Sequence, residues 1–415
     1  MFMWLIYFAG VLIYEAAVRV ASLFNDKAKL WVEGRNQQEE VWKALKGINE
    51  KRILFHCASL GEFEQGRPVI DALRAEYPDH KIVLTFFSPS GFEVRKNTPL
   101  ADYVFYLPMD GPCMSLKFIK AISPKMIFFV KYEFWYFYGK YIAKMKIPYY
   151  CVSAIFRSDQ VFFKFYGGFF RKILLRFTHF FVQDQNSLSL LYKMSIANVT
   201  VAGDTRFDRV VANAKHPLAL SEVKLFVGYS KVIVAGSTWK PDEEILNEFY
   251  LSIGEGFKLI IASHEIKQDN LLKLRDSFNG KAVLHSEWKS NTSGNYQVLL
   301  IDNVGMLSSL YQFADYAYIG GGFGSGIHNI LEATVFGVPV FFGPNFKRFK
   351  EANDLIKLKG AFSIANATDL SQQFNLLELD ESLYAKTKGF NEKYIHDNKG
   401  ATGLIMEYLR MNYES

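Results

Sequence analysis

The chain has 415 residues, which is longer than a chain with a single hydrophobic core usually is, so two domains are expected. Half of its residues are hydrophobic and 22% are charged, a balance that fits a folded globular protein and excludes a disordered one. The net charge of +6 favours anionic partners (phospholipid headgroups, nucleotides or nucleic acid), and three cysteines without a Cys-x-x-Cys pair indicate reduced thiols rather than a disulfide framework or a zinc site.

The N-terminal segment, residues 1–24, is almost uncharged and carries only Glu15 and Arg19. Its length is close to the roughly 20 apolar residues that span the hydrocarbon core of a bilayer. The basic residues follow the apolar run instead of preceding it, unlike those of a cleaved signal peptide: Lys27, Lys29, Arg35, Lys43 and Lys46. We predict a single N-terminal membrane anchor with the rest of the chain in the cytoplasm; the alternative is a buried core helix.

Short strands that are apolar on both faces alternate with helical segments after the anchor. Such strands are typical of a parallel sheet covered by helices on both sides. A helix is expected over residues 63–77. The strands expected in the first half are residues 53–57, 82–86, 103–107, 126–130, 149–153 and 180–183.

A second series of strands follows a segment that contains none. These strands are expected at residues 232–235, 259–262, 298–301, 316–320 and 338–341. The predicted fold class is therefore α/β, with two Rossmann-like doubly wound domains facing each other across a cleft: residues 25–210, a linker over 211–229, and residues 230–415. Ligands bind such sheets beyond the carboxyl ends of the strands, so functional residues are expected directly after the apolar runs.

The richest strand end is the stretch from Ile319 to Ala333, which has five glycines within residues 320–326. Glycines let the backbone approach a ligand closely, and a helix expected to start near Ile327 offers N–H groups to a phosphate. Glu332 lies one turn beyond Asn329, where its carboxylate accepts the hydroxyls of a ribose. The pattern predicts a nucleotide site that is neither a dinucleotide fingerprint nor a P-loop; the alternative is a plain strand-to-helix turn.

Other loops after strands have small and hydroxylated residues that suit phosphate. Phosphate contacts are expected from Gly236, Ser237, Thr238, Gly324, Ser325 and Gly326. Arg206, in the stretch from Gly203 to Asp208, is placed to meet an anionic group. Taken singly, each of these loops is more often ordinary loop chemistry.

Two carboxylates also follow strands. Glu62 comes after the first strand and opens a helix, so it is either a functional base or a side chain that complements the helix dipole. Glu133 follows a later strand. The chain has no His-Glu-x-x-His, Asp-x-Asp or Gly-x-Ser-x-Gly motif. This pattern favours a transferase without metal or cofactor over a metallohydrolase.

Together, these motifs resemble the 3-deoxy-D-manno-octulosonic acid (Kdo) transferases, GT-B glycosyltransferases of lipopolysaccharide synthesis. The resemblance covers nearly the whole chain and rests on the order and spacing of its motifs. They are the N-terminal anchor, Ser59-x-Gly61-Glu62, Thr85 to Gly91, Glu133-Phe134-Trp135, Gly203 to Asp208, Gly236-Ser237-Thr238 and His328-Asn329-x-Leu331-Glu332.

The resemblance implies a role for each matched position. Glu62 is the general base, and Glu133 and Arg206 stabilise the transition state. CMP is held by Ala262, Ser263, His264, Val304, Gly305, Met306, Leu307, Asn329, Ile330, Leu331 and Glu332. The chain departs from the family pattern in three places: Ala262-Ser263-His264 replaces Pro-Arg-His, Gly305-Met306-Leu307 replaces Gly-Glu-Leu, and Arg206 replaces a lysine.

The function expected from the resemblance is inverting transfer of Kdo from CMP-Kdo to the lipid A precursor (lipid IVA) at the cytoplasmic face of the cell inner membrane. The expected partners are CMP-Kdo, the anionic lipid acceptor and the membrane, and not nucleic acid. Three alternatives remain: a GT-B enzyme that joins another nucleotide sugar to another lipid, a non-hydrolysing nucleotide-sugar epimerase, and a catalytically silent nucleotide-sugar binding protein docked on a membrane.

Overall fold

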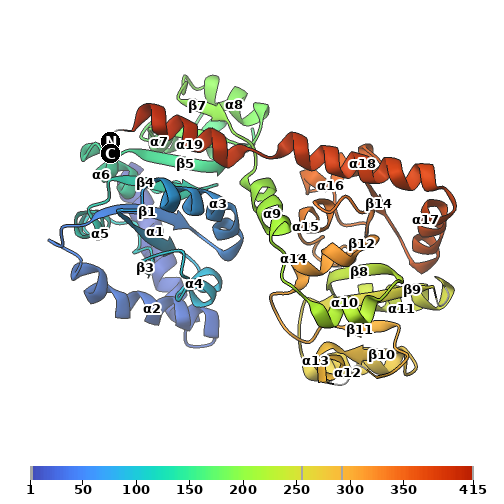
Figure 1. The fold of residues 1–415 in the computed structure, drawn as a ribbon. Helices are drawn as coiled ribbons and strands as arrows, with labels where there is room; N and C mark the ends of the chain where they lie inside the picture. The colour runs from blue at the N-terminus through green and yellow to red at the C-terminus, as the bar shows by residue number, and fades with distance from the viewer. Residues whose placement is uncertain (1–2, 254–255, 291–292, 414–415) are drawn as a thin grey trace. The chain divides into compact units, whose positions relative to one another are not determined.

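The computed structural model describes residues 3–253, 256–290 and 293–413, which form two compact α/β units (Figure 1). Unit 1 runs up to Arg209 and includes the residues from Lys399 on, and unit 2 runs from Val210 to Asn398. Within the described residues each unit contains one seven-stranded parallel sheet. This is the expected fold class of two Rossmann-like domains.

The sheet of unit 1 has the strand order β3-β2-β1-β4-β5-β6-β7. Strands are added on one side of β1 and then, from β4, on the other, so the sheet has a switch point between β1 and β4. In the register, Ile53 of β1 lies opposite both Ile82 of β2 and Met126 of β4. The strands are β1 Lys51–Cys57, β2 His80–Phe86, β3 Tyr103–Tyr106, β4 Met126–Val130, β5 Tyr149–Ala154, β6 His179–Val182 and β7 Val199–Val201.

Helices cover both faces of this sheet, and the alternation of its side chains fills two cores. Leu54 and Phe129 belong to one apolar cluster, and Phe55 and Phe128 to the other. This is why the strands are apolar on both faces. The helices are α2 Asp26–Lys43, α3 Leu60–Glu76, α4 Pro89–Arg95, α5 Met114–Ile122, α6 Tyr136–Lys144, η1 Val161–Phe163, α7 Gly168–Leu174, α8 Gln185–Tyr192, α9 Thr205–Lys215 and α19 Ala401–Asn412.

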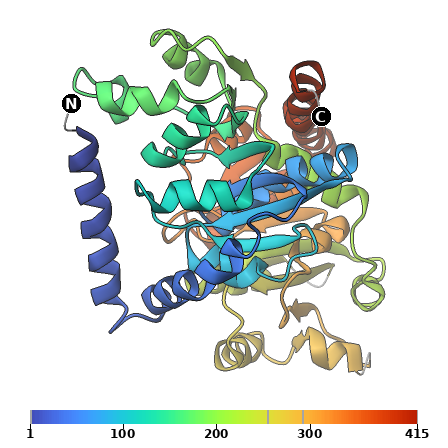
Figure 2. The same ribbon diagram turned by 90° about the vertical axis from the view of Figure 1, so that its left-hand side faces the viewer.

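The helix α1, Met3–Ala21, lies on the outside of unit 1 (Figure 2). Among the described helices it is the one long and apolar enough to cross a membrane. Most of its side chains are exposed, which disfavours the alternative of a buried core helix. A buried polar contact helps to hold it: the Tyr7 hydroxyl donates to the buried Asp110 carboxylate at 2.8 Å, and Asp110 also accepts the N–H groups of Phe137 and Tyr138.

The sheet of unit 2 has the order β10-β11-β9-β8-β12-β13-β14, with its switch point between β8 and β12. The strands are β8 Lys231–Thr238, β9 Phe257–Ser263, β10 Ala282–Leu284, β11 Val298–Leu300, β12 Tyr316–Ile319, β13 Val340–Phe342 and β14 Ala361–Ser363. The helices are α10 Ser221–Val227, α11 Lys240–Ile253, α12 Gln268–Ser277, α13 His285–Ser290, α14 Leu307–Leu310, η2 Tyr311–Phe313, α15 Leu331–Thr334, α16 Lys350–Lys357, α17 Ala367–Leu379 and α18 Glu381–Asn398.

The structure differs from the sequence-based expectation in two respects. The strands β7, β10 and β14 were not predicted; each has three residues and lies at a sheet edge, so its apolar run is too short to stand out. The last helix, α19, was assigned to the second domain at residues 230–415, but Ile405 and Leu409 pack in the core of unit 1 beside Val69 of α3. The expected linker, residues 211–229, contains the end of α9 and α10.

Candidate active site

Two carboxylates lie at the switch point of unit 1. Glu62 is in the first turn of α3, directly after β1, and Glu133 follows β4. Because β1 and β4 are hydrogen-bonded neighbours and run parallel, the segments that follow them leave the same edge of the sheet side by side. The topology therefore brings together two carboxylates that are 71 positions apart in the chain (133 minus 62).

Glu62 is held by the start of its own helix. Ser59 caps α3 and accepts the Glu62 N–H at 3.5 Å, and the Glu62 carboxylate accepts the N–H of Ala58. Burial raises the pKa of Glu62 to about 7, with a further rise from the nearby Glu133, while the Ala58 N–H and then Lys131 oppose the rise. A carboxyl group with a pKa near the working pH is suited to accept a proton in a reaction.

Glu133 is oriented by two ring nitrogens. The indole N–H of Trp135 donates to Glu133 Oε2 at 2.8 Å, and His56 Nε2 lies 3.3 Å from the same oxygen. His56 is completely buried within β1, and its Nδ1 lies 2.9 Å from the hydroxyl of Thr85. The sequence analysis missed His56; its one signal is a polar residue inside an otherwise apolar strand.

The backbone at this edge is strained beside Glu133. Lys131, the first residue after β4, has φ 61° and is not glycine. The left-handed conformation costs about 1–2 kcal/mol for such a residue. This turn carries the chain away from β4, and the Lys131 ammonium lies near enough to Glu62 to lower its pKa in opposition to burial.

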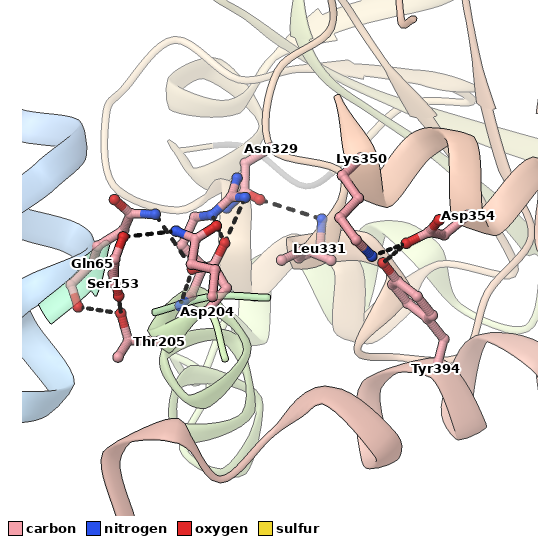
Figure 3. A network of polar contacts seen from close by, with 11 residues as sticks. Gln65, Ser153, Asp204, Thr205, Asn329, Leu331, Lys350, Asp354 and Tyr394 are labelled. Atoms are coloured by element: carbon pink, nitrogen blue, oxygen red, sulfur yellow. Dashed lines mark hydrogen bonds and ion pairs between the residues drawn. The ribbon is translucent and has the colours of Figure 1, made fainter. Parts of the chain in front are cut away.

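Arg206 is fixed by a neighbour that the sequence analysis did not single out. Its Nε donates to Asp204 Oδ2 at 2.8 Å, and Nη2 lies 2.7 Å from the same oxygen. Asp204 is held in turn by Gln65 Nε2 at 3.3 Å. Figure 3 shows Asp204 and Gln65 beside Ser153 and Thr205, whose hydroxyl oxygens are 2.7 Å apart. Gln65 lies on α3 one turn beyond Glu62, so hydrogen bonds through Asp204 connect the helix that carries Glu62 to the Arg206 guanidinium.

At the switch point of unit 2, glycines allow neighbouring backbone segments to lie in close contact. A Cβ on Gly320 would lie 2.3 Å from the carbonyl oxygen of Ser237, and one on Gly322 would lie 2.5 Å from the backbone nitrogen of Gly343. Ser237 itself has φ 54°. These glycines therefore pack the ends of β8, β12 and β13 together, in addition to any contact with a ligand.

The helix expected near Ile327 begins four residues later. Helix α15 comprises only Leu331–Thr334, and in the segment before it Gly321 and Gly326 have φ 89° and 126°. The expected helix start near Ile327 is therefore wrong, while the expectation that Gly324, Ser325 and Gly326 contact phosphate stays a prediction. Glu332, which is expected to bind the ribose, nevertheless lies beside Asn329, since Asn329 Nδ2 donates to Glu332 Oε1 at 3.0 Å.

Two acidic residues at the start of α11 organise the strand ends of unit 2, and the sequence analysis missed both. Asp242 is buried and accepts the N–H groups of Gly321 and Trp239, each at 2.9 Å. Glu243 Oε1 accepts the hydroxyls of Thr238 at 3.0 Å and Ser263 at 2.6 Å. In this arrangement the hydroxyl of Thr238, which is expected to contact phosphate, and that of Ser263, which is expected to hold CMP, both donate to Glu243. An acidic first turn is a common helix signal, which is why neither residue stood out.

Three aromatic side chains stack beside these loops. His264 lies with its ring centroid 4.5 Å from that of Trp239 and 4.5 Å from that of His328. The Trp239 indole N–H donates to His328 Nε2 at 3.0 Å. Burial, and then the proximity of His264, lower the pKa of His328, so its ring is neutral and able to accept this hydrogen bond at neutral pH.

The remaining residues expected to hold CMP follow β11 and begin α14. Val304 is exposed, Gly305 has φ 95°, and Met306 is buried. Leu307 packs where a Cβ on Gly236 would lie, at 2.7 Å. The residues predicted to hold CMP and phosphate thus follow four neighbouring strands, β11, β9, β8 and β12. In the part of the chain that the structure describes, no group of three or more His, Cys, Asp or Glu side chains is placed to hold a metal ion.

Comparison with known proteins gives the following matches. The sequence profile described as 3-deoxy-D-manno-octulosonic-acid transferase (kdotransferase) matches residues 31–209. The chain is 28% identical to the 3-deoxy-D-manno-octulosonic acid transferase of Aquifex aeolicus, covering 86% of the chain and 93% of that protein. It is 25% identical to that of Rickettsia felis, covering 95% and 83%. Among solved structures, the UDP-GlcNAc 2-epimerase from Neisseria meningitidis bound to UDP-GlcNAc has a TM-score of 0.62 at 17% identity, covering 87% of the chain and all of the epimerase. At that identity the likeness concerns the fold alone.

Proposed function

The chain belongs to the Kdo transferase family of glycosyltransferases, and from this premise we propose that it moves Kdo from CMP-Kdo to the lipid A precursor lipid IVA with inversion at the anomeric carbon. Kdo transfer in lipopolysaccharide biosynthesis is the family's activity; the acceptor and the stereochemistry are our proposals. The observation that carries the mechanism is the pair of carboxylates at the switch point of unit 1, where the pKa of Glu62 is raised to about 7.

In the proposed reaction Glu62 acts as the general base. Its carboxylate takes the proton from a sugar hydroxyl of the acceptor while that oxygen attacks the anomeric carbon of Kdo. The bond from that carbon to the phosphate oxygen breaks, and CMP leaves with the electron pair. A single displacement of this kind inverts the configuration. Glu133 stabilises positive charge that develops on the sugar, and Arg206 stabilises negative charge on the departing phosphate.

Donor binding is assigned to unit 2, with Glu332 on the ribose of CMP. Glu332→Ala is expected to weaken CMP binding by about 1–3 kcal/mol, the usual loss for a hydrogen bond to a charged group. Isothermal titration calorimetry with CMP measures this. Glu248→Ala, which removes an exposed carboxylate from α11, is the control and should bind CMP as wild type does. Unchanged affinity in a folded Glu332→Ala protein would remove the ribose assignment.

The membrane location is assigned to α1. Its exposed apolar side chains include Leu5, Ile6, Leu12 and Ile13, and the basic residues Lys27 and Lys29 follow it. We place α1 in the inner membrane and both units on the cytoplasmic face, where anionic headgroups attract the basic flank. The lipid acceptor then lies in the same membrane to which the enzyme is attached.

The proposed function is tested by release of CMP from CMP-Kdo with and without lipid IVA, with mass spectrometry of the lipid. We expect release that depends on the lipid and a product heavier by Kdo, and NMR of the new linkage gives the anomeric configuration. An epimerase would not need the lipid, an enzyme for another nucleotide sugar would not consume CMP-Kdo, and a silent binding protein would bind the donor without releasing CMP. Each of these results overturns the proposal.

A further inference from the structure

A cavity of about 570 Å³ lies in unit 1 between α1 and the body of the domain. Helix α1 touches the body at both ends of this cavity: Tyr7 packs on Phe169 with ring centroids 5.9 Å apart, and Tyr14 packs on Phe87 at 6.1 Å. Gly10 lies between these contacts, and a Cβ there would meet no atom within 4 Å. The cavity thus extends to the backbone of α1 at Gly10, which has no side chain to fill it.

The lining of this cavity is apolar and its volume lies in the range of roughly 300–1,000 Å³ that holds small ligands. Its walls are the helix itself and aromatic or thioether side chains such as Phe87, Met109 and Phe170. A peptide segment placed here would bring backbone N–H and C=O groups that these walls cannot pair, at a cost in free energy. A hydrocarbon chain brings none, so the chemistry of the walls selects a lipid tail over a protein segment.

The cavity adjoins the candidate active site through one side chain. Trp135 lines the cavity, and its indole N–H donates to Glu133 at 2.8 Å. Phe87, also in the wall, stacks on Trp135 with ring centroids 5.4 Å apart. A hydrocarbon chain in the cavity therefore lies against the residue that orients a catalytic carboxylate.

A second cavity, with charged side chains of both signs, borders the apolar one. It has a volume of about 480 Å³, and Val11 and Met109 line both. Its lining includes Arg35, whose Nη2 donates to the Phe87 carbonyl at 2.8 Å and whose buried Nε has no hydrogen-bond partner among the described residues. The other charged side chains in its lining are Arg19, Lys117, Glu15, Glu39 and Asp110, so basic and acidic side chains are equal in number. A polar cavity beside an apolar one matches an amphiphile, because its headgroup needs hydrogen-bond partners and its hydrocarbon chain does not.

We propose that this cavity binds one acyl chain of the lipid acceptor and positions its headgroup at Glu133 and Glu62. The inference rests on the proposed function, because it names the lipid acceptor as the occupant. The seated chain would give the enzyme a preference for acylated acceptors that is separate from membrane attachment. Each methylene group removed from water contributes about fourfold to binding, so even a partly seated chain has a large effect.

Filling the cavity from Gly10 tests the proposal. The quantity measured is the ratio of kcat/KM for lipid IVA to kcat/KM for the same phosphorylated disaccharide without acyl chains, in mixed micelles of fixed composition. Gly10→Phe is expected to lower this ratio by about tenfold or more, because its ring occupies the space of several methylene groups. Ala9→Phe is the control: it adds the same ring on the same helix at an exposed position outside the cavity and should leave the ratio unchanged.

Photo-cross-linking supplies a measurement that does not need turnover. Lipid IVA with a diazirine in one acyl chain should label the peptide that contains Phe169 and Phe170 in the wild type, and much less in Gly10→Phe. An unchanged ratio in Gly10→Phe, or equal labelling of that peptide in both proteins, would show that the cavity does not bind the acyl chain. If the wild-type protein transferred Kdo to neither acceptor but was still labelled, the proposed function would be wrong. The proposal that the cavity binds an acyl chain would stand.

Discussion

Replacing Glu62 by glutamine is expected to lower acceptor-dependent release of CMP by about 10²–10⁴-fold while CMP affinity stays at the wild-type value. Glutamine keeps the size of the side chain and an oxygen that accepts the Ala58 N–H, but it cannot take a proton from the acceptor hydroxyl. Turnover and CMP titration on the same preparation measure both effects. Glu64→Gln, two positions further along α3, is the matched control and should keep turnover within a fewfold of wild type.

The pH dependence of the same pair of proteins adds a second readout. Since the base must be ionised, wild-type activity should rise as the pH rises through about 7, the pKa to which burial raises Glu62. Stability moves in the opposite direction. A carboxyl group with a raised pKa in the folded state contributes stability that is complete below its unfolded value of 4.5 and is lost as the pH rises through about 7.

Residue 62 of Glu62→Gln does not titrate. The Tm of the variant should therefore rise relative to the wild-type Tm as the pH increases from 4.5 to 7, and the difference should stay constant above pH 7. The helix-dipole interpretation predicts a loss of about 0.3–1 kcal/mol in the variant at neutral pH, with turnover largely retained. Melting curves across this range distinguish the two interpretations. A variant that turns over normally and is less stable would leave Glu62 a capping residue and make Glu133 the next candidate for the base.

Replacing Arg206 by alanine should lower kcat by about 10²–10³-fold, the usual effect of removing one donor that stabilises charge in a transition state. The KM for CMP-Kdo should change much less, because the charge on the phosphate develops as CMP leaves. Arg206→Lys keeps the positive charge but not the planar guanidinium, so its kcat should lie between that of the wild type and that of Arg206→Ala. Added guanidinium should partly restore the alanine variant, a rescue that a purely structural role would not show.

Asp204 is a positioning residue for this guanidinium, because it fixes Arg206 through Nε and Nη2. Asp204→Asn removes the charge that orients Arg206 but leaves Arg206 in place. It should therefore lower kcat less than Arg206→Ala does, and guanidinium should not rescue it. If Arg206→Ala changed KM and kcat in equal proportion, or were not rescued at all, Arg206 would not be the group that stabilises the leaving phosphate.

The sequence by itself determined the fold class and which polar residues directly follow the strands. Runs such as Ile53–Cys57 and Met126–Val130 are short and mostly apolar on both faces, a pattern that is typical of a parallel strand covered on both sides. Polar residues directly after such runs, Glu62 and Glu133 among them, must leave the sheet at its carboxyl edge. These inferences use only the period of the side chains and the direction of the strands, which are local properties of the chain.

Tertiary structure alone decided which groups became partners. Gln65 and Asp204 are 139 positions apart, and His56 and Glu133 are 77 apart, so no spacing in the sequence predicts that they meet. The raised pKa of Glu62 depends on burial and on a second carboxylate delivered by strand order. Likewise, the sequence pattern of α19 predicts an amphipathic helix with one apolar face, but it does not predict whether that face packs against unit 1 or unit 2. Contacts between distant segments arise from the packing of whole elements, and local patterns of residues do not specify them.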